Sequence, residues 1–330
     1  MQRAVGAVVA AATGDALGAP YEFLAPIAAS DDVEMTGGGV LGWGEGEWTD
    51  DTAMAIVVLE AAATAPDHDL RIESALDQIA REWYTWSIGS PDIGLLTADV
   101  LRRAEQSAVA SGHSVPRARD LREAARHSAE ELPQAAGNGA LMRTHAVAVA
   151  CVDAPDDVVA SAALEIAQLT HRDPDVDDAC LLWTFAVRHA IRTGRIDVRV
   201  GIAQLDEDRQ ALWEDRILEA ESLRPAGFDR NGWVVQALQA AWSAIHSAGP
   251  VPEDRFARRE FLSRALEAAV RAGYDTDTVA CIAGALLGAA LGEKAVLPEW
   301  RRALFGWPGY EVDELVRLVH QVVPGTTGSA

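Results

Sequence analysis

Two short stretches, Gly46-Glu47-Trp48-Thr49-Asp50-Asp51-Thr52 and Gly273-Tyr274-Asp275-Thr276-Asp277-Thr278, combine threonines and aspartates in the same way. Each runs directly into an apolar segment, residues 53–59 in the first case and 279–291 in the second. Threonine and aspartate are common at helix N-termini because their oxygens accept hydrogen bonds from free backbone amides and because carboxylates interact favourably with the helix dipole. We therefore predict that each stretch forms the first turn of a buried helix.

A metal site would form if these two helix starts met in space. They would then place four aspartates and several threonines around a common centre. Carboxylate and hydroxyl oxygens suit hard cations such as Mg²⁺, Mn²⁺ or Ca²⁺ rather than zinc. Because crowded carboxylates repel one another, one site could hold two divalent ions. The alternative is that both stretches are ordinary helix starts that bind no metal.

The composition favours a helical protein. Hydrophobic residues make up 49% of the 330 residues, which is enough for a large core, and alanine is abundant. No segment shows the alternation typical of strands. We predict an all-α fold, with a single compact many-helix domain over residues 1–323 and a disordered tail over 324–330. Apolar periodicity predicts helices over residues 3–19, 50–64, 70–88, 94–111, 117–131, 139–153, 156–170, 175–194, 204–222, 231–247, 255–271, 277–292 and 310–322.

Charge, cysteines and hydropathy limit the possible partners. The formal net charge of −22 argues against direct nucleic-acid binding, because a phosphate backbone would be repelled. Cys151, Cys180 and Cys281 lie in apolar surroundings, which indicates buried, reduced thiols and a cytoplasmic setting. The longest apolar run, residues 279–291, is shorter than the about 20 residues that a membrane-spanning helix needs. We expect a cytoplasmic protein, monomeric, without a membrane partner.

The N-terminal region contributes an apolar helix and a candidate acid. In the predicted helix over residues 3–19, Gly6, Gly14 and Gly18 permit close contact with another helix or with a ligand. Glu22 stands between two aromatic residues just after this helix. A partly apolar pocket there would raise its pKa, whereas the alternative is an ordinary surface glutamate. Residues 30–48 are rich in glycine and acidic residues and are predicted to form a long loop that acts as a lid.

Further polar residues open other predicted helices. Asp92, in Pro91-Asp92-Ile93-Gly94, is predicted to cap the next helix. The stretch 137–143, Gly-Asn-Gly-Ala-Leu-Met-Arg, is a glycine-rich turn whose backbone amides could cradle a phosphate, although Asn-Gly is also a common turn dipeptide. His171 fits a residue that caps a helix end, and Trp233 fits a core residue at a helix start.

These motifs, taken together and in this order, resemble the ADP-ribosylglycohydrolase family, and within it the branch of the dinitrogenase-reductase-activating glycohydrolase. They span nearly the whole chain. The matching residues are Gly14-Asp15-Ala16-Leu17-Gly18 with Glu22, the stretch 46–52, Pro91-Asp92-Ile93-Gly94, the stretch 137–143, Thr170-His171, Gly232-Trp233-Val234 and the stretch 273–278.

The resemblance implies an all-helical fold with a binuclear metal centre in a cleft, holding two divalent cations, Mg²⁺ or Mn²⁺. It also implies that Glu22 lies near the metals, on or beside a mobile loop, and that Asp92 takes part in catalysis. His171 would lie near the distal portion of the substrate, and we expect Trp233 to stack on adenine. The implied metal ligands are Thr49, Asp50, Asp51, Asp275, Asp277 and Thr278. The turn implied to hold the ADP-ribose phosphates includes Gly137, Asn138, Gly139 and Met142.

The activity implied by the resemblance is metal-dependent hydrolysis that releases ADP-ribose from an ADP-ribosylated protein or small molecule. Asp92-Ile93-Gly94 and Glu47-Trp48 favour an arginine-linked, N-glycosidic substrate within the family. The alternatives are a hydrolase of serine-linked or small-molecule conjugates and a non-catalytic ADP-ribose binder. A metal-dependent hydrolase of phosphate esters would use the same carboxylates but release phosphate or AMP instead of intact ADP-ribose.

Overall fold

The computed structural model describes residues 1–131 and 136–323. The predicted disordered tail, residues 324–330, lies outside the described residues. The α-helices and strands that the described residues form, in chain order, are α1 (Gln2–Gly18), α2 (Asp50–Thr64), α3 (Glu73–Ser87), α4 (Leu95–Ala110), α5 (Ala118–Glu131), α6 (His145–Ala150), α7 (Asp156–Ala167), α8 (Pro174–Thr193), α9 (Glu207–Ser222), α10 (Val234–Ser247), α11 (Arg255–Val270), α12 (Thr276–Leu291), α13 (Pro298–Ala303), β1 (Phe305–Gly306), β2 (Tyr310–Glu311) and α14 (Val312–Val322).

The all-α prediction is confirmed, with two corrections. The single helix expected over residues 139–153 is wrong: a short 3₁₀ helix, Asn138–Ala140, and a turn precede α6. Arg143 and Thr144, in this turn, are both buried. The short helix α13 and the antiparallel pair β1–β2 were not predicted. Segments of two to six residues are too short for periodicity to reveal.

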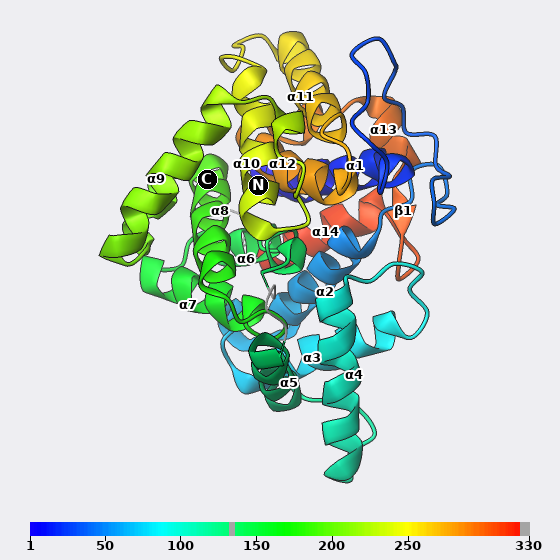
Figure 1. The fold of residues 1–330 in the computed structure, drawn as a ribbon, viewed down its shortest axis with the longest axis vertical. Coiled ribbons are helices and arrows are strands. Elements are labelled where there is room, and N and C mark those ends of the chain that lie inside the picture. The colour runs from blue at the N-terminus through cyan, green and yellow to red at the C-terminus, as the bar shows by residue number, and fades with distance from the viewer. Residues whose placement is uncertain (132–135, 324–330) are drawn as a thin grey trace, which may run out of the picture.

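Two apolar helices, α1 and α12, pack against each other at the centre of the molecule (Figure 1). Glycines make this contact close, as predicted. A Cβ atom added at Gly14 would lie 2.1 Å from the carbonyl oxygen of Ala280, and one at Gly18 would lie 2.4 Å from Cα of Asp277. Only glycine tolerates such a close approach of two backbones. The contact therefore brings Asp15, near the end of α1, to the first turn of α12.

The other helices surround this central pair. Helices α3, α4 and α5 gather at one end of the molecule (Figure 1). Helices α10 and α11 pack against α12, and α9 packs against α10. None of the described helices is both long and apolar enough to cross a membrane. The three cysteines are buried and unpaired in the described residues, as predicted.

The loop 30–48 makes hydrogen bonds with segments distant in sequence. Arg271 donates one to the carbonyl of Asp31 (2.6 Å), and the Trp48 amide donates one to the carbonyl of Phe305 (3.0 Å).

Candidate active site

The starts of α2 and α12 lie side by side, so the prediction that the two threonine–aspartate stretches begin buried helices and meet is confirmed. Thr49 Oγ1 lies 3.2 Å from Asp51 Oδ2 and 3.4 Å from Asp277 Oδ2. Thr278 Oγ1 lies 3.3 Å from the same Asp51 oxygen. All four side chains are buried. Residues more than 220 positions apart in sequence thus form one oxygen-rich cluster.

Asp15 completes this cluster, although sequence reasoning gave it no role in the site. It is fully buried and accepts hydrogen bonds from the amides of Thr49 (2.8 Å) and Thr52 (3.0 Å) and from the Thr52 hydroxyl (2.6 Å). Asp15 therefore caps α2 from another helix, and the Thr49 side chain makes no cap bond. The signal was a lone carboxylate within residues 4–18, a run otherwise free of charge, because such a residue has no exposed face to occupy.

The carboxylates of the cluster are hard to ionise together. Burial raises the pKa of Asp50, Asp51 and Asp277 well above the ordinary value, and the charges of neighbouring carboxylates raise it further. Asp51 Oδ1 is buried without a hydrogen-bond partner among the described residues. None of the ion pairs within residues 1–131 and 136–323 involves these aspartates. Oxygen donors without a cationic partner fit a hard divalent cation.

Two overlapping acidic groups share Asp277. Oxygens of Asp15, Asp51 and Asp277 lie within 4.8 Å of one another, and so do oxygens of Glu22, Asp92 and Asp277. Of the other predicted ligands, Asp50, Asp275 and Thr278 line the adjacent cleft. The structure therefore brings all six predicted ligands to one place and adds three further carboxylates.

Glu22 and Asp92 face this cluster from separate loops. Glu22 is 8% exposed, its Oε2 has no partner among the described residues, and burial, followed by the charge of Asp92, raises its pKa to about 10. This agrees with the predicted acid in a partly apolar pocket. Burial, followed by the charge of Asp275, raises the pKa of Asp92 to about 6. The prediction that Asp92 caps the next helix is wrong, because Gly94 is the N-cap of α4.

A cleft with a volume of about 540 Å³ opens onto these carboxylates. Its lining includes Glu22, Asp92 and residues of the glycine-rich turn. The predicted substrate residues that line it are Gly137, Asn138, Gly139, Met142 and His171. No residue of the loop 30–48 lines the cleft among the described residues, so the expected lid is not found there.

Trp233 lies in an adjoining pocket instead of the cleft. This second pocket, of about 580 Å³, shares Gly137 and Gly232 with the first. Trp233 is half-buried in its wall, so it is not purely a core residue. The guanidinium groups of Arg216 and Arg230 lie 5.8 Å and 5.9 Å from its ring centre. Cleft and pocket together could accept an extended ligand.

Known proteins resemble this chain in sequence and in fold. A sequence model described as ADP-ribosylglycohydrolase matches residues 1–328. The chain belongs to the ADP-ribosylglycohydrolase family. The chain is 29% identical to the ADP-ribosyl-[dinitrogen reductase] glycohydrolase of Rhodospirillum rubrum, covering 90% of this chain and 88% of that one. It is 26% identical to the ADP-ribosylarginine hydrolase Tri1 of Pseudomonas putida (strain GB-1), covering 91% of this chain and 73% of that one.

A solved structure also matches the fold. It is described as an ADP-ribosylglycohydrolase-related protein complex, with a TM-score of 0.65 and 27% identity, and the match covers 97% of this chain and 96% of that one. The resemblance inferred from the motifs and the helical fold that it implied are thereby confirmed.

In this ADP-ribosylglycohydrolase, Asn138 connects the glycine-rich turn to the acidic cluster. Its Nδ2 donates hydrogen bonds to Asp275 Oδ2 (2.8 Å) and to the Asn231 carbonyl (2.9 Å). The Asp275 amide in turn donates to Asn231 Oδ1 (3.2 Å). The side chain of Asn138 therefore positions an aspartate of the cluster, which sequence reasoning did not anticipate, because the turn was expected to act through its backbone.

His171 is a buried residue of the cleft wall. It is 2% exposed, and burial, followed by the nearby charge of Arg143, lowers its pKa to about 3. The imidazole is therefore neutral at physiological pH. It follows the end of α7 but packs against Gly137 and Gly139, which is a larger role than the helix cap that the sequence suggested.

Proposed function

We propose that this chain is a metal-dependent hydrolase that releases ADP-ribose from an ADP-ribosylated arginine side chain of a protein. The observation that carries the proposal is the buried cluster of aspartates and threonines without a cationic side chain, beside a glycine-lined cleft. Two relatives named for release of ADP-ribose from arginine or from dinitrogen reductase support it.

Two divalent cations, Mg²⁺ or Mn²⁺, would be held by Thr49, Asp50, Asp51, Asp275, Asp277 and Thr278. Such cations, when bound, orient sugar hydroxyls and act as Lewis acids. Two acidic groups that share Asp277 support a pair of ions. Asp15 would act as a positioning residue, because it holds the first turn of α2 through three hydrogen bonds.

The chain's own carboxylates would move the proton. Hydrolysis breaks the bond between the anomeric carbon and the guanidinium nitrogen; the water oxygen joins the carbon, and a proton goes to the leaving nitrogen. Glu22 and Asp92 line the cleft where this bond would lie, and Glu22 Oε2 has no partner within the described residues. We assign proton transfer to this pair of carboxylates.

The remaining contacts bind and orient the substrate. The turn at Gly137 and Gly139 would receive the phosphates, as expected for backbone amides at a glycine-rich turn. Trp233 would stack on adenine in the adjoining pocket. The carboxylates that line the cleft and the net charge of −22 suit a cationic arginine acceptor better than a neutral serine. The same chemistry would apply to a small ADP-ribosylated guanidine.

The test is product analysis with matched substrates. The purified protein is incubated with ADP-ribosyl-arginine peptide, ADP-ribosyl-serine peptide and a phosphodiester, each with EDTA, Mg²⁺ or Mn²⁺, and the products are identified by mass spectrometry. We expect metal-dependent release of intact ADP-ribose from the arginine peptide. Release from the serine peptide alone would overturn the acceptor assignment. Release of AMP or phosphate would overturn glycosidic cleavage, and binding of ADP-ribose without turnover would identify a binding protein.

A further inference from the structure

The glycine-rich turn, residues 137–143, ends in a buried arginine that the proposed reaction does not use. Arg143 is fully buried, and no ion pair of the described residues involves it. Its guanidinium stacks on the Trp83 ring, 4.2 Å from the ring centre, and Nη1 donates to the Gly139 carbonyl (2.9 Å). An unpaired buried cation is costly, because burial removes its hydration. Such a residue calls for a specific role.

Arg143 begins a chain of hydrogen bonds that ends in the cleft. Its Nη2 donates to Thr170 Oγ1 (2.6 Å), and Thr170 Oγ1 lies 2.7 Å from His171 Nδ1. Thr170 is fully buried. Within the described residues, Arg143 and His171 are the two hydrogen-bond partners of this hydroxyl. The three side chains therefore form a short relay from the protein interior to the cleft wall.

The direction of the relay follows from the chemistry of its first member. A guanidinium has N–H donors and no acceptor, so Thr170 Oγ1 must accept from Arg143. His171 Nδ1 is the other hydrogen-bond partner of this hydroxyl among the described residues. If Nδ1 carried a hydrogen, the buried hydroxyl hydrogen would have no acceptor there, which is costly, so Nδ1 accepts it. A neutral imidazole that accepts at Nδ1 carries its hydrogen on Nε2. We propose that Arg143, acting through Thr170, fixes His171 as the Nε2–H tautomer and thereby makes it a hydrogen-bond donor to an oxygen of the ligand.

The Nε2 atom of His171 lies beside the cleft, where it can donate to a ligand. Cβ atoms added at Gly137 and Gly139 would lie 3.4 Å and 3.5 Å from Nε2, so this nitrogen borders the two glycines that line the cleft. Burial and the charge of Arg143 also keep the imidazole neutral, since they lower its pKa to about 3. A neutral donor of fixed direction suits a phosphate or hydroxyl oxygen. The identification of that ligand as ADP-ribose rests on the proposed function, whereas the tautomer does not.

Nuclear magnetic resonance measures the tautomer directly. In protein labelled with ¹⁵N-histidine, the ring-nitrogen shifts distinguish Nε2–H from Nδ1–H, and His171→Gln assigns the signal among the eight histidines. We expect His171 to be Nε2–H in the wild type with no ligand present. A wild-type signal that reports Nδ1–H overturns the inference, and this result requires no variant to fold.

Variants at Thr170 test whether the relay positions the donor. Thr170→Val removes the hydroxyl and keeps the shape, so we expect mixed tautomers and about tenfold weaker ADP-ribose binding. Thr170→Ser keeps the hydroxyl and should bind within about threefold of the wild type. Thr184→Val is the matched control, because Thr184 is equally buried and shares its hydroxyl with Thr144 (2.6 Å) rather than with His171.

The two proposals fail in different ways. If Thr170→Val keeps both the Nε2–H tautomer and the wild-type affinity, Arg143 and Thr170 have no positioning role. An equal loss of affinity in Thr184→Val would also overturn that role, since it would reflect general destabilisation. If the wild type itself neither binds nor releases ADP-ribose, the proposed function fails. The tautomer measurement on the free protein then still supports or overturns the relay.

Discussion

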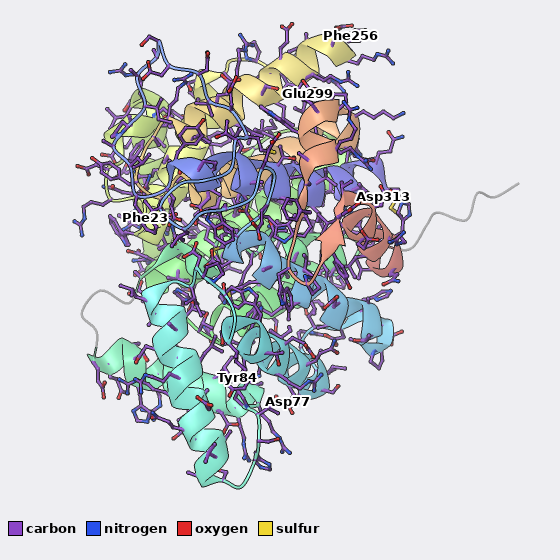
Figure 2. The ribbon with its side chains drawn as sticks, turned by 90° about the vertical axis from the view of Figure 1, so that its right-hand side faces the viewer. Phe23, Asp77, Tyr84, Phe256, Glu299 and Asp313 are labelled. Atoms are coloured by element: carbon purple, nitrogen blue, oxygen red, sulfur yellow. The ribbon has the colours of Figure 1, made fainter. Side chains whose placement is uncertain are left out.

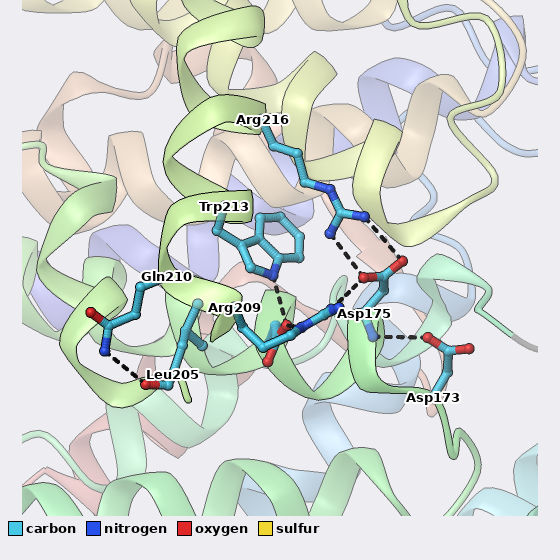
Figure 3. A network of polar contacts seen from close by, with 8 residues as sticks. Asp173, Asp175, Leu205, Arg209, Gln210, Trp213 and Arg216 are labelled. Atoms are coloured by element: carbon cyan, nitrogen blue, oxygen red, sulfur yellow. Dashed lines mark hydrogen bonds and ion pairs between the residues drawn. The ribbon is translucent and has the colours of Figure 1, made fainter. Parts of the chain in front are cut away.

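Helices α2 and α8 both begin with clustered aspartates, yet their surroundings differ completely. At α2, Asp51 lies among other carboxylates and hydroxyls without a cationic side chain from the described residues. At α8, Arg209 donates to Asp178 (2.6 Å) and to Asp175 (2.5 Å), and Arg216 donates to Asp175 (2.8 Å) (Figure 3). The first site has carboxylates that need an external cation, whereas the second has its cations built in.

The ionisation of the two sites reflects this difference. Burial raises the pKa of Asp51 well above the ordinary value, and its carboxylate neighbours raise it further. Burial also acts to raise the pKa of Asp175, but hydrogen bonds from Arg216 and Arg209 outweigh it, so that this pKa is lowered. Aspartates at a helix start thus predict the helix, and the charges supplied by other helices decide between a structural and a ligand-binding role.

The largest expected effect is on the acidic cluster. Asp277→Asn keeps the shape of the residue that both acidic groups share, and we expect turnover to fall by about a thousandfold or more. Because the change removes one of several repelling carboxylates, the unfolding temperature in EDTA should not fall. The increase in that temperature on adding Mg²⁺ or Mn²⁺ should disappear. Near-normal turnover at saturating metal would contradict the metal assignment.

The matching substitution in the second site is Asp175→Asn. It leaves Arg209 and Arg216 without their shared carboxylate, so we expect a loss of about 2 kcal/mol in the free energy of unfolding. At saturating substrate, turnover per folded molecule should stay close to that of the wild type, whereas KM should rise, because Asp175 also lines the pocket of Trp233. Denaturant unfolding and the ADP-ribose release assay measure the two quantities. A large loss of turnover without a loss of stability would remove the contrast between the sites.

Helix α8 also contains an aspartate, Asp177, that has neither the crowded carboxylates of the first site nor the arginine partners of the second, and lowering the pH should stabilise the protein through it. Asp177 receives its hydrogen bond from Gln168 rather than from an arginine (2.8 Å), and burial raises its pKa to about 6. Between this value and the unfolded value of 3.8, the folded state binds a proton that the unfolded state does not, so this contribution to stability grows as the pH falls. From pH 7 to pH 5, the wild type should gain about 1 kcal/mol relative to Asp177→Asn. If denaturant unfolding shows the same change in the free energy of unfolding for both proteins between pH 7 and pH 5, the pKa of Asp177 is not raised.

The smallest expected effect concerns backbone strain beside the two sites. Tyr274, next to the cap of α12, has a φ of 62°, whereas Asp173, the cap of α8, has a φ of −144°. A left-handed conformation costs a non-glycine residue about 1 kcal/mol, so Tyr274→Gly should raise the free energy of unfolding by up to about 1 kcal/mol. A clear loss of stability in Tyr274→Gly would mean that the Tyr274 side chain contributes more than its strain costs.

Phe23, beside Tyr274, also has a left-handed backbone conformation (φ 64°). Its amide donates a hydrogen bond to the Tyr274 carbonyl (2.6 Å), and its side chain is exposed at the surface (Figure 2).

Local sequence predicted most of the helices but not the turns between them. Periodic apolar runs such as that of α12 need a buried face, and the threonines and aspartates before them have few alternatives to a helix start. The region 139–153 misled the same reasoning, because its apolar residues are buried by a turn as well as by α6. The loop 30–48 was expected to act as a lid because it is long and leads directly into Thr49. Its position depends on contacts with Arg271 and Phe305, which lie far away in sequence.

The sequence by itself determined the helical class, the chemical character of the two threonine–aspartate stretches and the excess of negative charge, because these depend on residue type and spacing. Only the tertiary structure decided that Asp15 joins those stretches while Asp175 meets two arginines. It also decided that Arg143 reaches His171 through Thr170. The physical reason is that a carboxylate or imidazole acquires its function from the charges and donors around it, and helices distant in sequence supply them.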